Sequence, residues 1–165
     1  MYKRQALADF AVANVEGLDA DAVTAAAADY VAELEALDAE VEALVGTLAD
    51  EQRVLITNHD VFGYFADRYD FEVVGTVIPS GSTLDGTSAE ALAELVEVIE
   101  AEGVSAIFGD VTASTELAET LADEVGEIAI VELFSEALGG ADSEAATYVA
   151  MVRTNAERIV GALAS

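Results

Sequence analysis

The sequence predicts an α/β fold: a mainly parallel, four-stranded sheet flanked by helices on both faces and preceded by one long linker helix. Two observations lead to this prediction. Residues 21–48 contain no proline and no glycine before Gly46, which favours one long helix. From residue 54 onward, short apolar segments of strand length alternate with amphipathic segments of helix length. This alternation requires crossover connections, and crossovers produce parallel sheets with both faces covered.

The elements of the sheet region follow from the change in apolar period along the chain. Runs of apolar and β-branched residues predict strands at 54–57, 71–78, 105–108 and 127–133. Apolar residues at steps of three and four predict helices at 60–69, 88–102, 114–124 and 145–164. One long connection rich in Gly and Ser is expected at 79–87.

The segment 21–48 has one continuous apolar face. At 1.5 Å per residue, such a helix extends for about 40 Å. A helix with this pattern needs a packing partner along its length, and a helical hairpin or a coiled-coil dimer is the alternative to a linker helix. Its large apolar side chains recur at alternate steps of four and three, at Tyr30, Leu34, Leu37, Val41, Leu44 and Leu48.

The charge of the chain is strongly negative. Its 33 acidic and 6 basic residues give a formal net charge of −27 at pH 7. This charge excludes ordinary binding to nucleic acid or to an anionic membrane, because both require a basic surface. The acidic residues are spread over all the predicted helices, and most are expected to be solvated surface groups. Together with the single lysine, this pattern is typical of proteins from salt-rich environments and predicts a halophilic protein.

The first five residues differ in composition from the rest. Residues 1–5 contain the single lysine and two of the six basic residues, ahead of an acidic chain. They resemble a translated sequencing adaptor. The chain is therefore expected to be a fragment of a longer protein.

Three polar side chains follow the carboxyl ends of predicted strands. His59, the only histidine, follows the strand 54–57, Asp110 follows 105–108, and Glu136 follows 127–133. Ligand sites of open α/β sheets lie outside this edge, where such side chains converge. One imidazole and two carboxylates predict a site for a divalent metal ion. The alternative is a surface or capping role for His59 and a helix N-cap role for Asp110.

Other kinds of chemistry lack their usual motifs. The chain has no cysteine, no G-x-G-x-x-G, no G-x-x-x-x-G-K-[ST] and no G-x-S-x-G. His59 and Asp110 with Ser114 or Ser135 could form an esterase-like set, although no motif requires it. A metal-dependent hydrolase domain remains an alternative, because an open coordination position separates catalytic metal sites from carrier sites. An acidic interaction module without a ligand is a third reading.

Several motifs resemble one family of metal-binding proteins. The segment 58–69, N-H-D-V-F-G-Y-F-A-D-R-Y, resembles the H-D-A-F-x-Y-F-A-x-x-Y signature of the zinc- and manganese-binding solute-binding proteins of ABC transporters. Residues 106–110 resemble its I-F-x-E, 117–126 its L-A-x-x-x-G and 133–138 its L-x-x-D-x-L. Tyr148, Met151 and Asn155 match its closing Y-x-x-M-x-x-N helix. Residues 30–38 resemble the Y-x-x-x-L-x-x-L-D of the family's long interlobe helix.

The resemblance implies a two-lobed protein that holds a divalent metal ion between its lobes and delivers it to a membrane permease. The ion is Zn²⁺ or Mn²⁺, carried as a transported ligand, and the protein is not an enzyme. The family implies an extracytoplasmic location, membrane-anchored in the full-length form. The resemblance further implies a remnant of the N-terminal lobe at 1–20, the linker helix at 21–50 and the C-terminal metal-binding lobe at 51–165.

Carried over by position, His59, Asp110 and Glu136 fall on three of the family's four metal ligands. The fourth ligand, a histidine of the N-terminal lobe, has no counterpart here. Asp110 stands where the family usually has Glu or His, and Glu136 where it usually has Asp. This exchange keeps both charges but moves one methylene group from one ligand to the other.

Overall fold

The computed structural model describes residues 2–78, 88–112, 116–126 and 128–164. The chain divides into two compact units, Met1–Glu40 and Val41–Ser165. The predicted connection at 79–87 lies outside the described residues. No described helix is both long enough and apolar enough to cross a lipid bilayer.

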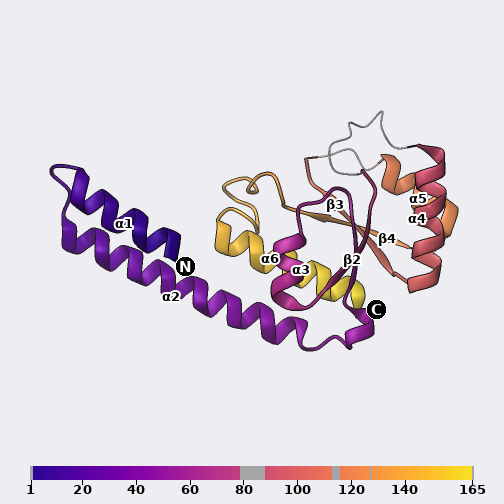
Figure 1. Ribbon diagram of the computed structural model, residues 1–165, viewed down its shortest axis with the longest axis horizontal. Coiled ribbons are helices and arrows are strands. Elements are labelled where there is room, and N and C mark those ends of the chain that lie inside the picture. The colour runs from indigo at the N-terminus through magenta and orange to yellow at the C-terminus, as the bar shows by residue number, and fades with distance from the viewer. Residues whose placement is uncertain (1, 79–87, 113–115, 127, 165) are drawn as a thin grey trace. The chain divides into compact units, whose positions relative to one another are not determined.

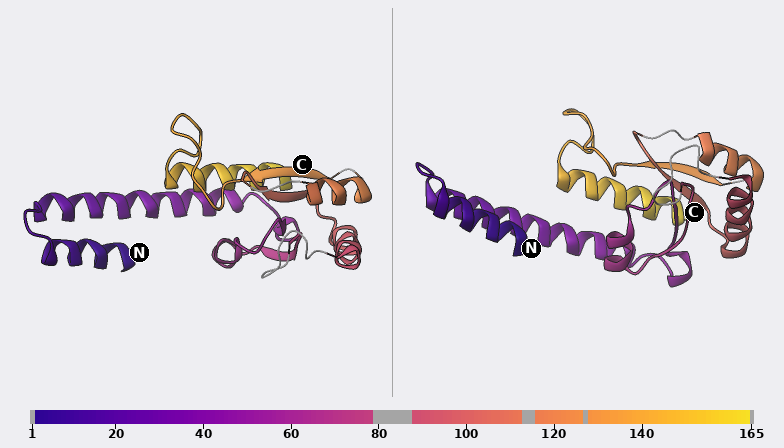
Figure 2. Two further views of the ribbon diagram at one scale, coloured as in Figure 1. Left: turned by 90° about the horizontal axis from the view of Figure 1, so that it is seen from above. Right: turned by 45° about the horizontal axis from the view of Figure 1, so that its top comes forward.

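The first unit is helical. Helix α1 (Tyr2–Asn14) lies alongside the first part of helix α2 (Ala20–Val45), as Figures 1 and 2 show. Gly17 adopts a φ of 83° in the turn between them, a conformation that favours glycine. The carboxylate of Asp19 accepts a hydrogen bond from Ala22 N at 3.1 Å and so caps the start of α2.

Helix α2 ends at Val45, three residues before the predicted end at 48. The reason is a tightening of the backbone after Gly46. Thr47 N and Leu48 N donate to carbonyls three residues back, at 3.1 and 3.0 Å, rather than four residues back. A short 3₁₀ turn, η1 (Asp50–Gln52), then leads into the sheet.

The second unit contains a four-stranded parallel sheet, as predicted. Its strands are β1 (Val54–Thr57), β2 (Glu72–Thr76), β3 (Ala106–Asp110) and β4 (Ala129–Leu133), in the order β2-β1-β3-β4. Strand β3 runs two residues beyond its predicted end, because Gly109 and Asp110 continue to pair with Glu132 and Leu133 of β4. Asp110 is therefore the last residue of a strand rather than the first of a loop.

Helices cover both faces of this sheet, also as predicted. Helices α4 (Ala89–Glu102) and α5 (Glu116–Val125) contact one another and cover one face, where α4 and α5 are neighbours in Figure 1. Their side chains form a core with Ile56 of β1 and Ile107 of β3, both fully buried. Helix α3 (Gly63–Tyr69) contacts β2, and helix α6 (Tyr148–Leu163) contacts β3 and β4.

The start of α3 departs from the prediction of a helix from residue 60. Residues 58–62 form a turn instead, in which Val61 N donates to His59 O at 3.0 Å. The hydroxyl of Thr57 donates to the same carbonyl at 3.0 Å. His59 thus lies in the turn between β1 and α3 and not in the first turn of the helix.

Candidate metal centre

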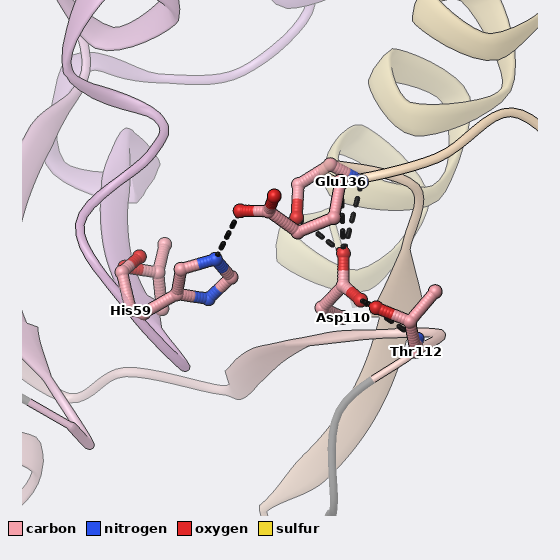
Figure 3. A network of polar contacts seen from close by, with 6 residues as sticks. His59, Asp110, Thr112 and Glu136 are labelled. Atoms are coloured by element: carbon pink, nitrogen blue, oxygen red, sulfur yellow. Dashed lines mark hydrogen bonds and ion pairs between the residues drawn. The ribbon is translucent and has the colours of Figure 1, made fainter. Parts of the chain in front are cut away.

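His59 and Glu136 meet at the carboxyl-terminal edge of the sheet. The imidazole Nε2 of His59 lies 3.0 Å from Oε1 of Glu136, and the two side chains point toward one another in Figure 3. The side chain of His59 is 29% exposed and that of Glu136 60% exposed. One nitrogen and one carboxylate therefore face each other at a place that solvent can reach.

The backbone before His59 is held on both sides. Asn58 N donates to Phe108 O of β3 at 2.8 Å, and Asn58 O accepts from Ile78 N at 2.8 Å. These bonds extend the pairing of the sheet up to the residue next to His59. The turn that carries the imidazole therefore starts from a fixed point.

The loop that carries Glu136 is fixed by Asn155 of α6. The side-chain oxygen of Asn155 accepts from Phe134 N at 2.9 Å, and its amide nitrogen donates to Phe134 O at 2.7 Å. Asn155 is only 5% exposed. The chain leaving β4 is thus bound to α6 two residues before Glu136.

Asp110 lies beneath this loop with its carboxylate surrounded by donors. Its Oδ1 accepts from Thr112 N at 2.7 Å and from the Thr112 hydroxyl. Its Oδ2 accepts from Ser135 N at 3.0 Å, from the Ser135 hydroxyl and from Glu136 N at 3.3 Å. Asp110 is 2% exposed. Burial by itself raises the pKa of Asp110, but the hydrogen bonds from Ser135 and Thr112 outweigh it and lower the pKa to about 2.

The three candidate residues from the sequence analysis lie at the same edge of the sheet, but their side chains have different partners. His59 and Glu136 face each other, whereas the oxygens of Asp110 face Thr112, Ser135 and the backbone of Glu136 (Figure 3). Among the described residues, no group of three or more His, Cys, Asp or Glu side chains is arranged to hold a metal ion. This part of the protein thus offers a pair of candidate ligands above a buried carboxylate.

The esterase-like alternative has no support in this geometry. The Ser135 hydroxyl donates to Asp110, and the imidazole of His59 is paired with Glu136. A serine nucleophile needs its hydroxyl within reach of the base. The other candidate, Ser114, lies outside the described residues.

Two residues of the site have no assigned role in the sequence prediction. In the sequence analysis, Asn155 is named only as a position of the Y-x-x-M-x-x-N motif, and Thr112 is not named. Asn155 lies 21 residues from the backbone that it binds, so no local pattern connects them. Thr112 gives a weak local signal, because short polar residues two positions after an Asp often bind its carboxylate.

A cavity beside the site lies between α3 and α6. It has a volume of about 350 Å³, and its lining includes Phe65, Tyr69, Phe134, Tyr148 and Met151. Neither His59 nor Glu136 lines it. The candidate ligands therefore lie outside this mainly apolar cavity.

Comparison with known proteins identifies the family. The sequence model of the zinc-uptake complex component A, periplasmic, matches residues 6–162. The chain belongs to this zinc-uptake component A family. The resemblance drawn from the sequence motifs is thereby confirmed, and the hydrolase alternative has no support among the relatives of this family member.

This chain spans about half the length of the curated relatives that it matches. It is 40% identical over 140 residues to the zinc-binding protein TroA of Treponema pallidum, an alignment that covers 82% of this chain and 45% of TroA. It is 30% identical over 149 residues to the manganese-binding lipoprotein MntA of Bacillus subtilis, covering 87% of this chain and 48% of MntA. The structure of periplasmic zinc-binding TroA from T. pallidum superimposes with a TM-score of 0.84 at 34% identity, over 96% of this chain and 58% of that one.

Proposed function

We propose that this chain is the C-terminal lobe and linker helix of an extracytoplasmic solute-binding protein that captures Zn²⁺ or Mn²⁺ and delivers it to an ABC-transporter permease. In this proposal residues 1–20 are a remnant of the N-terminal lobe, 21–50 contain the linker and 51–165 form the metal-binding lobe. The full-length protein is membrane-anchored. The chain binds metal and does not catalyse a reaction. The family membership and the names of TroA and MntA support the choice of ions.

One observation carries the proposal: the 3.0 Å approach of His59 Nε2 to Glu136 Oε1. An ion bound at roughly 2.1 Å to both atoms in tetrahedral geometry would place them roughly 3.4 Å apart. The pair needs to open by only a few tenths of an ångström to admit an ion. The partial exposure of both side chains gives the ion a route from solvent.

The donor types suit both proposed ions. A neutral imidazole is a common ligand of zinc, and a carboxylate oxygen suits manganese and zinc alike. In this proposal His59 and Glu136 bind the ion directly. Asp110, the third residue of the predicted set, contributes its negative charge from beneath the loop. Two ligands from this chain leave further positions of the ion to water or to the other lobe.

Calorimetric titration with Zn²⁺ and with Mn²⁺ tests the proposal. The chain alone should bind at micromolar or weaker affinity, about −8 kcal/mol or less favourable, because its ligand set is incomplete. His59→Ala and Glu136→Ala should each abolish detectable binding. The matched control is Glu94→Ala, which removes an exposed carboxylate from α4 and should change nothing.

Two outcomes would contradict the proposal. Nanomolar binding by this chain, or binding indifferent to His59→Ala, would place the site elsewhere. Metal-dependent turnover of a phosphate or acyl ester that is lost in His59→Ala would favour the hydrolase reading instead.

A further inference from the structure

The carboxylate of Asp110 has no free position toward the candidate ligands. It receives hydrogen bonds from five donors, two on Oδ1 and three on Oδ2. A carboxylate offers about four lone-pair directions, so these donors occupy them all. Asp110 itself is only 2% exposed, so its carboxylate oxygens lie beneath the loop and not at the surface where His59 and Glu136 meet. Binding an ion through Asp110 would require at least one of these part-buried hydrogen bonds to be given up, which is unfavourable.

The donors of Asp110 come from the two loops that leave neighbouring strands. Thr112 follows β3, and Ser135 and Glu136 follow β4. On the other side, Asn155 binds both backbone groups of Phe134. Three successive residues, 134 to 136, are therefore fixed by buried polar side chains from β3 and α6. Glu136 is the member of this run whose side chain points away, toward His59 (Figure 3).

We propose that Asp110 is the positioning residue of the metal centre: its carboxylate fixes the loop that carries Glu136 and does not itself bind the ion. This inference rests on the proposed function, since it concerns how that site is assembled. It assigns two ligands, His59 and Glu136, to this chain in place of the three that the sequence predicts. Groups that orient a metal ligand commonly affect affinity by 10- to 100-fold when removed.

The first arm of the test combines Asp110→Asn with Glu136→Gln. Asn keeps the volume of Asp110 but replaces one carboxylate oxygen with an NH₂ group. This group cannot accept a hydrogen bond from Thr112 or Ser135. Zn²⁺ affinity should fall by about 10- to 100-fold in Asp110→Asn. When Glu136→Gln is already present, Asp110→Asn should lower Zn²⁺ affinity by less than about 2-fold further. The reason is that a residue acting only by positioning the Glu136 carboxylate has no effect once that carboxylate is gone. An independent ligand would give the full loss in both backgrounds.

The second arm uses Ser135→Ala, for which the two readings predict opposite signs. Removing the hydroxyl loosens the loop and frees one lone pair of Asp110. A positioning role predicts weaker Zn²⁺ binding, whereas a ligand role predicts unchanged or tighter binding. Ser105→Ala is the matched control, because it removes a part-buried hydroxyl that donates to Ala162 O at 3.2 Å near the opposite end of β3. Asp123→Asn, on an exposed position of α5, controls for the loss of one charge.

A spectroscopic arm reports on the ligand set independently of stability. Co²⁺ replaces the bound ion, and its visible absorption bands depend on the atoms that coordinate it. At saturation, Asp110→Asn should show the wild-type bands, with only the midpoint of the titration displaced. A change in band position would mean that a ligand has been lost and would overturn the inference.

The outcomes separate this inference from the proposed function. If the wild-type chain binds neither Zn²⁺ nor Co²⁺, the proposed function fails and the inference fails with it. If binding depends on His59 and Glu136 but Asp110→Asn is neutral, or costs the same in both backgrounds, only the inference is overturned. If Asp110→Asn does not fold, the sign of the Ser135→Ala effect decides.

Discussion

The side-chain amide of Asn155 binds both backbone polar groups of Phe134, accepting from the N–H at 2.9 Å and donating to the carbonyl at 2.7 Å. The buried side chain of Asn155 thus makes the two backbone hydrogen bonds that a neighbouring strand would make with Phe134, the residue that follows β4. The same contact sets the direction in which the chain continues to Glu136.

Asn155→Ala should destabilise the second unit by about 2 kcal/mol or more, because it leaves two part-buried backbone groups of Phe134 without their partner, at about 1 kcal/mol or more each. Asn155→Asp should destabilise the unit at least as much at neutral pH, because its buried carboxylate would place an oxygen against the Phe134 carbonyl. Urea unfolding monitored by circular dichroism measures both values. Equal stability of wild type and Asn155→Ala would mean that the contact is not formed.

Glu136→Gln should separate metal binding from stability. The pair of His59 and Glu136 is partly exposed, so its loss should change the free energy of unfolding by less than about 1 kcal/mol. The loss of the carboxylate charge should nevertheless weaken Zn²⁺ binding by more than about 10-fold, because an uncharged amide is a poorer ligand for a divalent cation. Thermal melts of the metal-free protein and calorimetric titration test the two parts. A large drop in stability would assign Glu136 a structural role instead.

Asp110 should make the fold sensitive to strong acid. Its pKa is lowered from 3.8 to about 2 in the folded chain, so the folded state favours the charged form. A depressed pKa contributes stability above the unfolded value that is lost as pH falls through the folded value, here between about 4 and 2. At 1.36 kcal/mol per pKa unit the contribution is about 2 kcal/mol.

Urea unfolding of wild type and Asp110→Asn at pH 7, 4, 3 and 2, in molar KCl to limit charge repulsion, measures this contribution. The wild type should be more stable at pH 7, and its advantage should shrink as the pH approaches 2. A constant difference across this range would show that the charge of Asp110 does not stabilise the fold.

The net charge of −27 should make stability depend on salt. The Debye length is about 30 Å at 0.01 M and about 3 Å at 1 M ionic strength, so molar salt screens the repulsion among the acidic side chains. The midpoint of thermal unfolding should therefore rise steadily in KCl from millimolar to molar. A flat melting temperature in KCl would remove the argument for a halophilic protein.

Local patterns predicted the elements of this protein well. Strand β1 has its predicted bounds, Val54–Thr57, because an apolar β-branched run is closed there by polar residues on both sides. Helix α4 begins one residue after its predicted start at 88, because Ser88 is its N-cap and the Ser88 hydroxyl accepts from Ala91 N at 3.1 Å. Departures occur where tertiary pairing extends an element, as at the end of β3, or where a turn competes with the helix, as at residues 58–62. The end of β3 and the turn at 58–62 depend on contacts with other segments, which the local sequence pattern does not contain.

The sequence by itself determined that His59, Asp110 and Glu136 come to one edge of a parallel sheet, because each lies at the end of a strand and parallel strands share their carboxyl edge. Only the tertiary structure decided which of these side chains face each other. His59 and Glu136 are 77 residues apart, and their approach depends on the directions of two separate loops. Asp110 turns inward because Thr112, its near neighbour in sequence, and Ser135 both donate to its carboxylate. The contact with Ser135 depends on the pairing of β3 with β4, which brings the two loops together.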